Sequence, residues 1–248
     1  MAESWQPANE PQALPLNEVH VWRLALDQPD AVWQRLERVL TPDEVARADR
    51  FYFARDRRRF VVSRAAVRLL LAHYLELPSS AIQFYAGPYG KPYAGPKLEA
   101  TPLQFNVSHS EEMALLGFVR QRQLGIDIEF RKPLAEIREI AINFFSPHEV
   151  ATLMGLPSTL QPLGFFNCWS RKEAYIKAIG KGLSQPLDSF DVTLRPGEPA
   201  RLLRVAGQPD ELARWQMQIL EPHAGYAAAL AIEGDGWQLR CFDYTLTS

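Results

Sequence analysis

Two segments of this 248-residue chain predict helix starts with almost the same sequence: residues 41–46 are TPDEVA and residues 146–151 are SPHEVA. Each begins with a hydroxyl residue that can cap a helix, followed by proline at the first helical position and glutamate where a capping box requires it. A longer predicted helix follows each start, where VSRAA at 62–66 corresponds to WSRKE at 169–173. The sequence therefore favours an internal duplication of an α+β unit, with chance similarity as the alternative.

Late in each half, at 113–119 and 226–232, lies an apolar strand rich in small residues, and the two units would join near residues 120–126. We predict a flexible N-terminal tail over 1–16, an N-terminal α+β subdomain over 17–122 and a C-terminal α+β subdomain over 123–248. Ligands favour the seam between such units, so we expect the active site in the cleft between them. The predicted strands are 19–26, 104–107, 113–119, 125–129, 190–194, 215–220 and 226–232, with 237–244 as a further candidate. The predicted helices are 31–39, 42–53, 57–75, 134–143, 147–154 and 163–179, and the glycine- and proline-rich segment 87–102 is a predicted loop.

Composition narrows the class of protein. With 47% hydrophobic and 23% charged residues the chain has the composition of a soluble globular protein. A net charge of −2 provides no basic field for nucleic acid, so no nucleic-acid partner is expected. Two cysteines, Cys168 and Cys241, form no disulfide or metal-binding pattern, which fits a reducing cytoplasm. No apolar run reaches the roughly 18 residues of a membrane helix, and the polar start has no apolar signal core.

Asp127 and Glu129 are the first candidates for chemistry. They are two residues apart on a predicted strand, so both carboxylates lie on one face, opposite Ile126 and Ile128. Their repulsion would be relieved by a divalent cation, and oxygen-only ligands suit Mg²⁺. An acid pair at the end of an exposed strand is the alternative.

Glu173 is the third acid. On the helix 163–179 it falls within an apolar arc, between Trp169 and Phe166, whereas Arg171 should point away from this arc. A glutamate on a buried face is unusual unless it is paired, and Lys177 follows at the spacing that favours an ion pair. The alternative is a simple intrahelical salt bridge at the edge of the core.

Several other polar residues suit phosphate. Ser108 and His109 lie in the turn that follows the predicted strand 104–107, where they could hold a phosphate or accept a proton. A capping or turn role is the alternative. A Ser-His-Asp hydrolase is disfavoured because the chain has no nucleophile elbow of the G-x-S-x-G type. Lys91 lies in a loop from which it could reach a phosphate, without P-loop glycine spacing. The first-half helices carry an arginine cluster that suits phosphate or is simply a solvated surface: Arg47, Arg50, Arg55, Arg57, Arg58, Arg59 and Arg64.

Six segments, taken together and in their order along the chain, resemble a 4′-phosphopantetheinyl transferase of the surfactin-synthetase-activating type. The matching segments are GKP at 90–92, FNVSHS at 105–110, GIDIE at 125–129, FFS at 144–146 with Glu149, WSRKEAYIK at 169–177 and GKGL at 180–183. The resemblance covers roughly residues 40–195 and implies a duplicated α+β fold and a monomer. It also implies transfer of the 4′-phosphopantetheine arm of coenzyme A to a serine of an apo acyl or peptidyl carrier protein, with Mg²⁺ as cofactor and 3′,5′-ADP as product.

Carried over to this chain, the resemblance implies that Asp127, Glu129 and Glu173 hold Mg²⁺. Glu173 would also act as general base for the carrier serine, and Lys177 would stabilise the pyrophosphate and the leaving group. The nucleotide end of coenzyme A would be held by Lys91, Ser108 and His109, with His109 near the 3′-phosphate. Arg47, Arg50 and Arg59 would surround that phosphate.

The carrier protein would dock against residues 134–163, which include Phe144, Phe145, Met154 and Leu156; core packing of these side chains is the alternative. Two other functions stay open at this point. One is a metal-dependent nucleotide phosphohydrolase, which shares the acids but needs no carrier protein. The other is a non-catalytic module that binds coenzyme A or a carrier protein.

Overall fold

The fold was obtained as a computed structural model, which describes residues 4–94 and 103–246. The strands are β1 (Trp5–Ala8), β2 (Glu18–Ala25), β3 (Phe84–Ala86), β4 (Pro92–Ala94), β5 (Leu103–Ser110), β6 (Met113–Arg120), β7 (Leu124–Phe130), β8 (Phe190–Val192), β9 (Leu202–Val205), β10 (Trp215–Leu220), β11 (Tyr226–Glu233) and β12 (Gln238–Tyr244). The helices are α1 (Asp30–Glu37), α2 (Pro42–Ala48), α3 (Ala54–Leu75), α4 (Ile137–Phe144), α5 (Pro147–Met154), α6 (Gln161–Ile179) and α7 (Glu211–Arg214). Most predicted elements are present, with ends that differ by a few residues.

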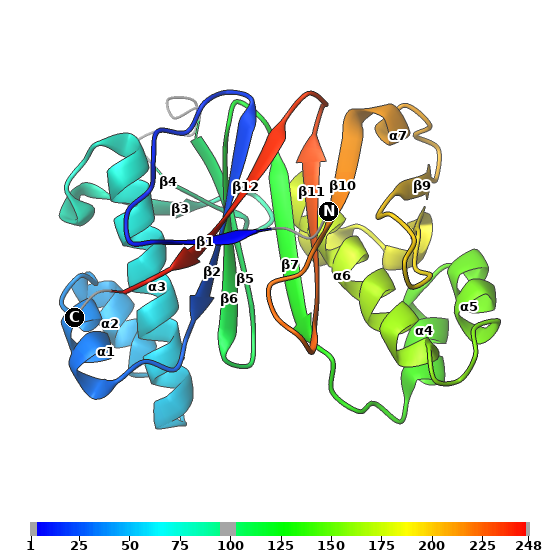
Figure 1. Ribbon diagram of the computed structural model, residues 1–248, viewed down its shortest axis with the longest axis horizontal. Coiled ribbons are helices and arrows are strands. Elements are labelled where there is room, and N and C mark those ends of the chain that lie inside the picture. The colour runs from blue at the N-terminus through cyan, green and yellow to red at the C-terminus, as the bar shows by residue number, and fades with distance from the viewer. Residues whose placement is uncertain (1–3, 95–102, 247–248) are drawn as a thin grey trace.

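Two sheets form the centre of the molecule, and helices cover their outer faces (Figure 1). The first sheet has the strand order β1-β12-β2-β6-β5, and the second has the order β10-β11-β7. Helices α1–α3 pack on the first sheet and α4–α6 on the second, each over its own apolar core. Between the sheets lies a third core, to which Val21 and Leu115 contribute from one side and Ile126 and Leu230 from the other. This arrangement agrees with the predicted α+β fold of two related halves.

The capping box of the first half is tied to the long helix that follows it. Glu44 accepts a hydrogen bond from the Thr41 amide and pairs with Arg68 of α3 at 2.8 Å. Arg68, which is 1% exposed, also donates to the carbonyl oxygens of Ser79 and Ile82. A buried cation therefore connects the short helix, the long helix and the segment after it.

The second half repeats this arrangement. Glu149 accepts from the Ser146 amide and pairs with Lys172 of α6 at 2.7 Å, and both side chains are fully buried. Lys172 also donates to two carbonyl oxygens beyond the helix, those of Leu187 and Phe190. Lys172 thus plays the part of Arg68, not of Ala65 as the predicted alignment implies, a shift of about one helical turn. The shared contacts support the predicted duplication.

Both chain ends depart from the predicted boundaries. Trp5–Ala8, predicted to be part of a loose tail, instead pairs in parallel with β12, and the Trp5 indole donates to the carbonyl oxygen of Glu221. Strand β12 lies between β1 and β2, so the last strand of the predicted C-terminal subdomain belongs to the first sheet. The prediction of a flexible tail is wrong for Trp5–Ala8, because these residues are held in place by strand partners more than 200 residues away in the sequence.

Part of the predicted loop 87–102 is a hairpin in which β4 pairs with β3, while residues 95–102 lie outside the described residues. Gly90 has a φ of +84° at the turn, a conformation that favours glycine. The predicted helix 42–53 ends at Ala48, and β8 is shorter than predicted. In the two described ranges, no helix combines the length and apolar character needed to cross a bilayer. Cys168 and Cys241 are both buried.

Candidate active site

Gly125 allows α6 to lie unusually close to β7. A Cβ atom at this position would be 2.1 Å from the Ala174 carbonyl oxygen and 2.3 Å from the Ala178 amide nitrogen. Because alternate residues of a strand share a face, Asp127 and Glu129 face α6 together with Gly125. The close approach brings the Lys177 side chain of α6 to the Asp127 carboxylate.

Asp127 is the most enclosed of the three predicted acids, at 2% exposure. Its Oδ1 accepts from Lys177 Nζ at 2.5 Å and from Ser108 Oγ at 2.9 Å. Its Oδ2 is buried and has no hydrogen-bond partner among the described residues. A buried carboxylate oxygen without a partner is costly, so this atom is a candidate ligand for a cation.

Glu129 and Glu173 are half-buried near Asp127. Burial, followed by the charge of Asp127, raises the pKa of Glu129 to about 7, although Lys177 and a hydrogen bond from Ser110 oppose this shift. Burial and the charge of Asp127 also raise the pKa of Glu173, and Lys177 again acts in the opposite direction. The three acids therefore share one electrostatic environment, and Lys177 is the cation within it.

Strand β5 holds β7 through side chains. Alternate residues of β5 accept hydrogen bonds from alternate backbone amides of β7, in the pairs Asn106–Ile126 (2.9 Å), Ser108–Ile128 (3.4 Å) and Ser110–Phe130 (3.0 Å). The two serines also donate to Asp127 and Glu129. The seam between the halves is thus a row of polar side chains that fixes both carboxylates.

The opposite side of β5 faces a pocket of about 650 Å³ in the first half. Phe105, Val107 and His109 line it from β5, and Gly90 and Pro92 line it from the β3–β4 hairpin. Its basic wall comes from α2 and α3 and consists of Arg47, Arg55, Arg59 and Arg64. Desolvation, followed by the charges of Lys177 and Arg59, lowers the pKa of His109. His109 therefore lines the basic pocket within range of the charges of Lys177 and Arg59.

The arginines of this wall differ in their partners. Arg59 makes two hydrogen bonds of 2.7 Å to Asp27, and Arg64 pairs with Glu44 at 2.6 Å. Arg47 stacks over the Phe60 ring and forms no ion pair within the described ranges. Phe60 contributes an aromatic ring to the pocket, so it fits there without a polar role.

Three residues predicted to hold the nucleotide do not line the basic pocket. Arg50 is exposed and outside the pocket lining. Ser108 contacts Asp127 and Lys177, because it points from β5 toward β7 and away from the basic wall. Lys91 points into the seam, where its ammonium donates to carbonyl oxygens of Leu124 and Ala178. The sequence did not predict the contact of Ser110 with Glu129 or that of Arg64 with Glu44. The alternation of Asn106, Ser108 and Ser110 was the signal that could have indicated the first of these.

The sequence places Arg171 outside the apolar arc of α6, and the structure shows that this side of the helix is covered as well. Its guanidinium is buried and donates to the carbonyl oxygens of Thr193 and Glu198. These residues belong to the segment around β8 and β9, which covers the second side of α6. The helix is therefore buried on more faces than its apolar arc indicated.

Within residues 4–94 and 103–246, the structure contains no group of three or more Asp, Glu, His or Cys side chains close enough to hold a metal ion together. The ammonium of Lys177 lies against Asp127 instead. The donor chemistry nevertheless fits Mg²⁺, because three carboxylates lie near one another and Asp127 Oδ2 is unpartnered.

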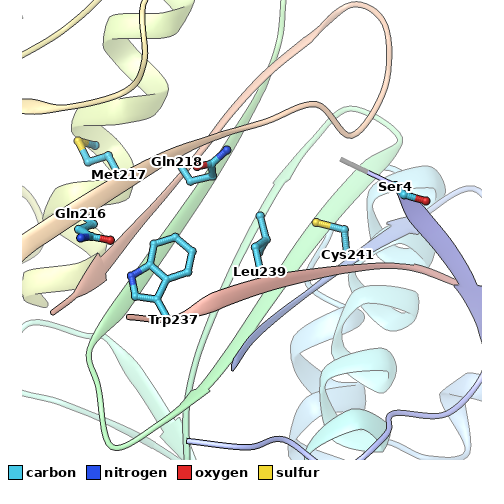
Figure 2. Close-up of a pocket in the computed structure, with 7 residues that line it drawn as sticks. All are labelled: Ser4, Gln216, Met217, Gln218, Trp237, Leu239 and Cys241. Carbon is cyan, nitrogen blue, oxygen red and sulfur yellow. The ribbon is translucent and has the colours of Figure 1, made fainter. Parts of the chain in front are cut away.

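A second groove, of about 420 Å³, lies between β10 and β12 (Figure 2). None of its described lining residues is an acid, histidine, lysine or arginine: Ser4, Gln216, Met217, Gln218, Trp237, Leu239 and Cys241. This groove lacks the charged side chains that bind phosphates, unlike the basic pocket beside β5.

Comparison with known proteins identifies the family of this chain. Residues 123–231 match the 4′-phosphopantetheinyl transferase superfamily, and residues 27–118 match the N-terminal domain of a 4′-phosphopantetheinyl transferase. The chain is 37% identical over 244 residues to the 4′-phosphopantetheinyl transferase HetI of Nostoc sp., which covers 98% of this chain and 100% of HetI. This chain belongs to the 4′-phosphopantetheinyl transferase superfamily.

Other transferases of the superfamily are also similar. The 4′-phosphopantetheinyl transferase Sfp of Bacillus subtilis is 37% identical over 161 residues, which are 65% of this chain and 69% of Sfp. The transferase psf-1 of Bacillus pumilus is 35% identical over 169 residues, which are 68% of this chain and 70% of psf-1. This 4′-phosphopantetheinyl transferase is an enzyme that transfers 4′-phosphopantetheine from coenzyme A to carrier proteins.

Proposed function

We propose that this transferase moves the 4′-phosphopantetheine arm to a serine hydroxyl of an apo carrier protein and releases 3′,5′-ADP in a Mg²⁺-dependent reaction. The observation that carries this proposal is the position of β5, which presents His109 to the basic pocket and Ser108 to the acids. A nucleotide in the pocket would place its pyrophosphate toward Lys177 and the three carboxylates. Binding and chemistry would then occupy opposite sides of one strand.

The nucleotide end of coenzyme A would bind in the basic pocket. Arg47 is the arginine best suited to the 3′-phosphate, since it has no carboxylate partner among the described residues, whereas Arg59 and Arg64 are already paired. An unpaired guanidinium can form two parallel hydrogen bonds with a phosphate. Arg59 and His109 would add positive charge and a polar edge beside it.

Asp127, Glu129 and Glu173 would hold Mg²⁺. When bound, the ion would offset the charge of the pyrophosphate in a reaction that depends mainly on positioning and electrostatic stabilisation. The unpartnered Asp127 Oδ2 would gain a cationic partner. The like-charge repulsion that helps to raise the pKa of Glu129 and of Glu173 would be relieved.

Glu173 would accept the proton of the carrier serine. Burial, the main cause of its raised pKa, would favour uptake of a proton by this carboxylate. Lys177 lies one turn along α6 and would place its ammonium where charge develops on the leaving phosphate oxygen. Ser108 holds this ammonium at 3.0 Å and would keep it oriented during the reaction.

The carrier protein would dock beside α4. Of the predicted docking residues, Phe145 and Leu156 belong to the core, whereas Phe144 is 45% exposed. Ile142 is 56% exposed, and Phe144 contacts the ring of Trp169 on α6. Exposed apolar side chains on the subdomain that supplies the acids would suit a partner that must bring its serine to them.

Substitution of Glu173 tests the mechanism. Glu173→Gln should retain coenzyme A binding and lower transfer by about 10²-fold or more, the size of a general-base effect. Mass spectrometry of an apo carrier protein, which gains one phosphopantetheine arm, measures transfer; calorimetry measures binding. The matched control is Glu76→Gln, at the exposed end of α3.

Unchanged transfer by Glu173→Gln would remove this residue from the mechanism. Hydrolysis of the coenzyme A pyrophosphate without a carrier protein, at a rate matching transfer, would instead favour a phosphohydrolase. Both outcomes are visible in the same reaction mixtures, because the products differ in mass.

A further inference from the structure

Lys91 lies between two residues of the nucleotide pocket, but its side chain does not enter that pocket. Gly90 and Pro92 line the pocket, whereas Lys91 directs its side chain into the seam between the two halves. The hairpin therefore has one surface for the nucleotide and another for the C-terminal half. A contact on the second surface can respond to occupancy of the first.

The Lys91 ammonium contacts both elements that carry the acids. It donates to the Ala178 carbonyl oxygen at 2.9 Å and to the Leu124 carbonyl oxygen at 3.1 Å. Ala178 directly follows Lys177 on α6, and Leu124 begins β7, three residues before Asp127. A third hydrogen bond goes to the side chain of Gln123 at 3.1 Å. One amine thus joins α6, β7 and the hairpin.

Glycines make room for this contact. Gly180 ends α6 with a φ of +70°, and a Cβ atom there would lie 3.2 Å from Cδ of Lys91. A Cβ on Gly182 would lie 3.5 Å from the carbonyl oxygen of Tyr89, at the hairpin turn. The hairpin therefore packs directly on the end of α6.

The electrostatics favour a cation at this point. The last carbonyl groups of a helix carry partial negative charge, so an ammonium there satisfies them and stabilises the helix end. Burial lowers the pKa of Lys91 to about 8. An apolar side chain would fill the space without the cost of burying a charge, but it would leave the Leu124 and Ala178 carbonyl oxygens without their hydrogen-bond donor.

We propose that Lys91 is a positioning residue that couples the nucleotide pocket to the catalytic helix. By holding α6 and β7 to the hairpin, it sets the position of Glu173 and Lys177 relative to Asp127 when the pocket is filled. This inference rests on the proposed placement of the nucleotide, and it assigns Lys91 to the protein framework rather than to a phosphate.

Hydrogen exchange of the wild-type enzyme with 3′,5′-ADP tests the coupling directly. We expect slower exchange in the hairpin, residues 84–94, and also at the end of α6, residues 174–179. Protection of the hairpin alone would overturn the coupling. Protection of neither segment would instead show that the nucleotide binds elsewhere, which would reject the pocket assignment itself.

Lys91→Met provides the second test. Transfer by the folded variant should fall in kcat by about 10-fold or more, a typical effect of losing a supporting contact, while its Kd for coenzyme A changes by less than about threefold. The variant should also lose the protection of residues 174–179 by 3′,5′-ADP. The matched control is Lys181→Met, an exposed lysine near the same helix end, which should behave as wild type.

An unchanged kcat in Lys91→Met would overturn the proposal. So would a Kd increase of about 10-fold or more, since it would mean that the ammonium binds the nucleotide. If the variant fails to fold, the exchange experiment on the wild-type enzyme still decides between coupling and its absence.

Discussion

Gly125→Ala is the most direct test of the close approach between α6 and β7. The new Cβ would lie 2.1 Å from the Ala174 carbonyl oxygen, 2.3 Å from the Ala178 nitrogen and 2.8 Å from the Lys177 carbonyl carbon. All three contacts are backbone atoms, so no rotamer change can relieve them. With ordinary contacts beginning at 3.4 Å, α6 must retreat by roughly 1 Å, at a cost of about 1–3 kcal/mol or more.

This movement displaces Lys177 and Glu173 from Asp127. A misplacement of about 1 Å in a catalytic constellation can lower the rate by about 10²-fold. The proposed nucleotide pocket lies in the first half and is not lined by Gly125, so coenzyme A affinity should stay nearly unchanged. We therefore expect a lower melting temperature and a kcat/KM about 10²-fold below wild type, measured as mass gain of an apo carrier protein.

The matched control is Gly117→Ala on β6. Its Cβ would meet the Leu124 side chain at 2.7 Å, which a rotamer change can relieve, and it contacts no backbone of α6. This variant should lose some stability and keep its kcat/KM. If Gly125→Ala retains wild-type stability and activity, the glycine does not set the distance between β7 and α6.

Two further predictions follow from charges in the site. Without metal, the folded state holds a proton on Glu129 between its usual pKa of 4.5 and about 7, so this residue lowers stability as pH rises through that window. Glu129→Gln should therefore raise the melting temperature in EDTA at pH 8 but hardly at pH 4.5, and equal increases at both would contradict the burial of its charge. Arg47→Glu should weaken binding of coenzyme A more than that of 3′-dephospho-coenzyme A in calorimetry, with the exposed Arg38→Glu as control; equal losses would place the 3′-phosphate elsewhere.

Local patterns were the predictable part of this fold. Both capping boxes were visible because Thr41 and Glu44, like Ser146 and Glu149, interact within one turn. The shared face of Asp127 and Glu129 followed from strand alternation alone. What these patterns did not contain was the burial of each glutamate against a cation of the following long helix.

Contacts between distant segments were not predictable in the same way. The burial of Arg171 did not follow from the sequence, because helical phase describes only the helix itself and not the segment around β8 and β9 that covers its other side. Lys91 was recognisable as a loop lysine, but nothing local indicates whether its side chain turns to the pocket or to the seam. Trp5–Ala8 has no long alternating pattern, so its pairing with β12 depends on residues from the other end of the chain.

The place of β12 in the first sheet has a consequence for biosynthesis. A ribosome releases the N-terminal half first, yet that half then lacks an interior strand: β2 has one open edge, and β1 has no neighbour to join. Completion of the first sheet must wait until residues 238–244 have emerged. The first sheet is therefore complete only when both ends of the chain are present, and a fragment that ends at the seam would expose an unpaired strand edge to aggregation.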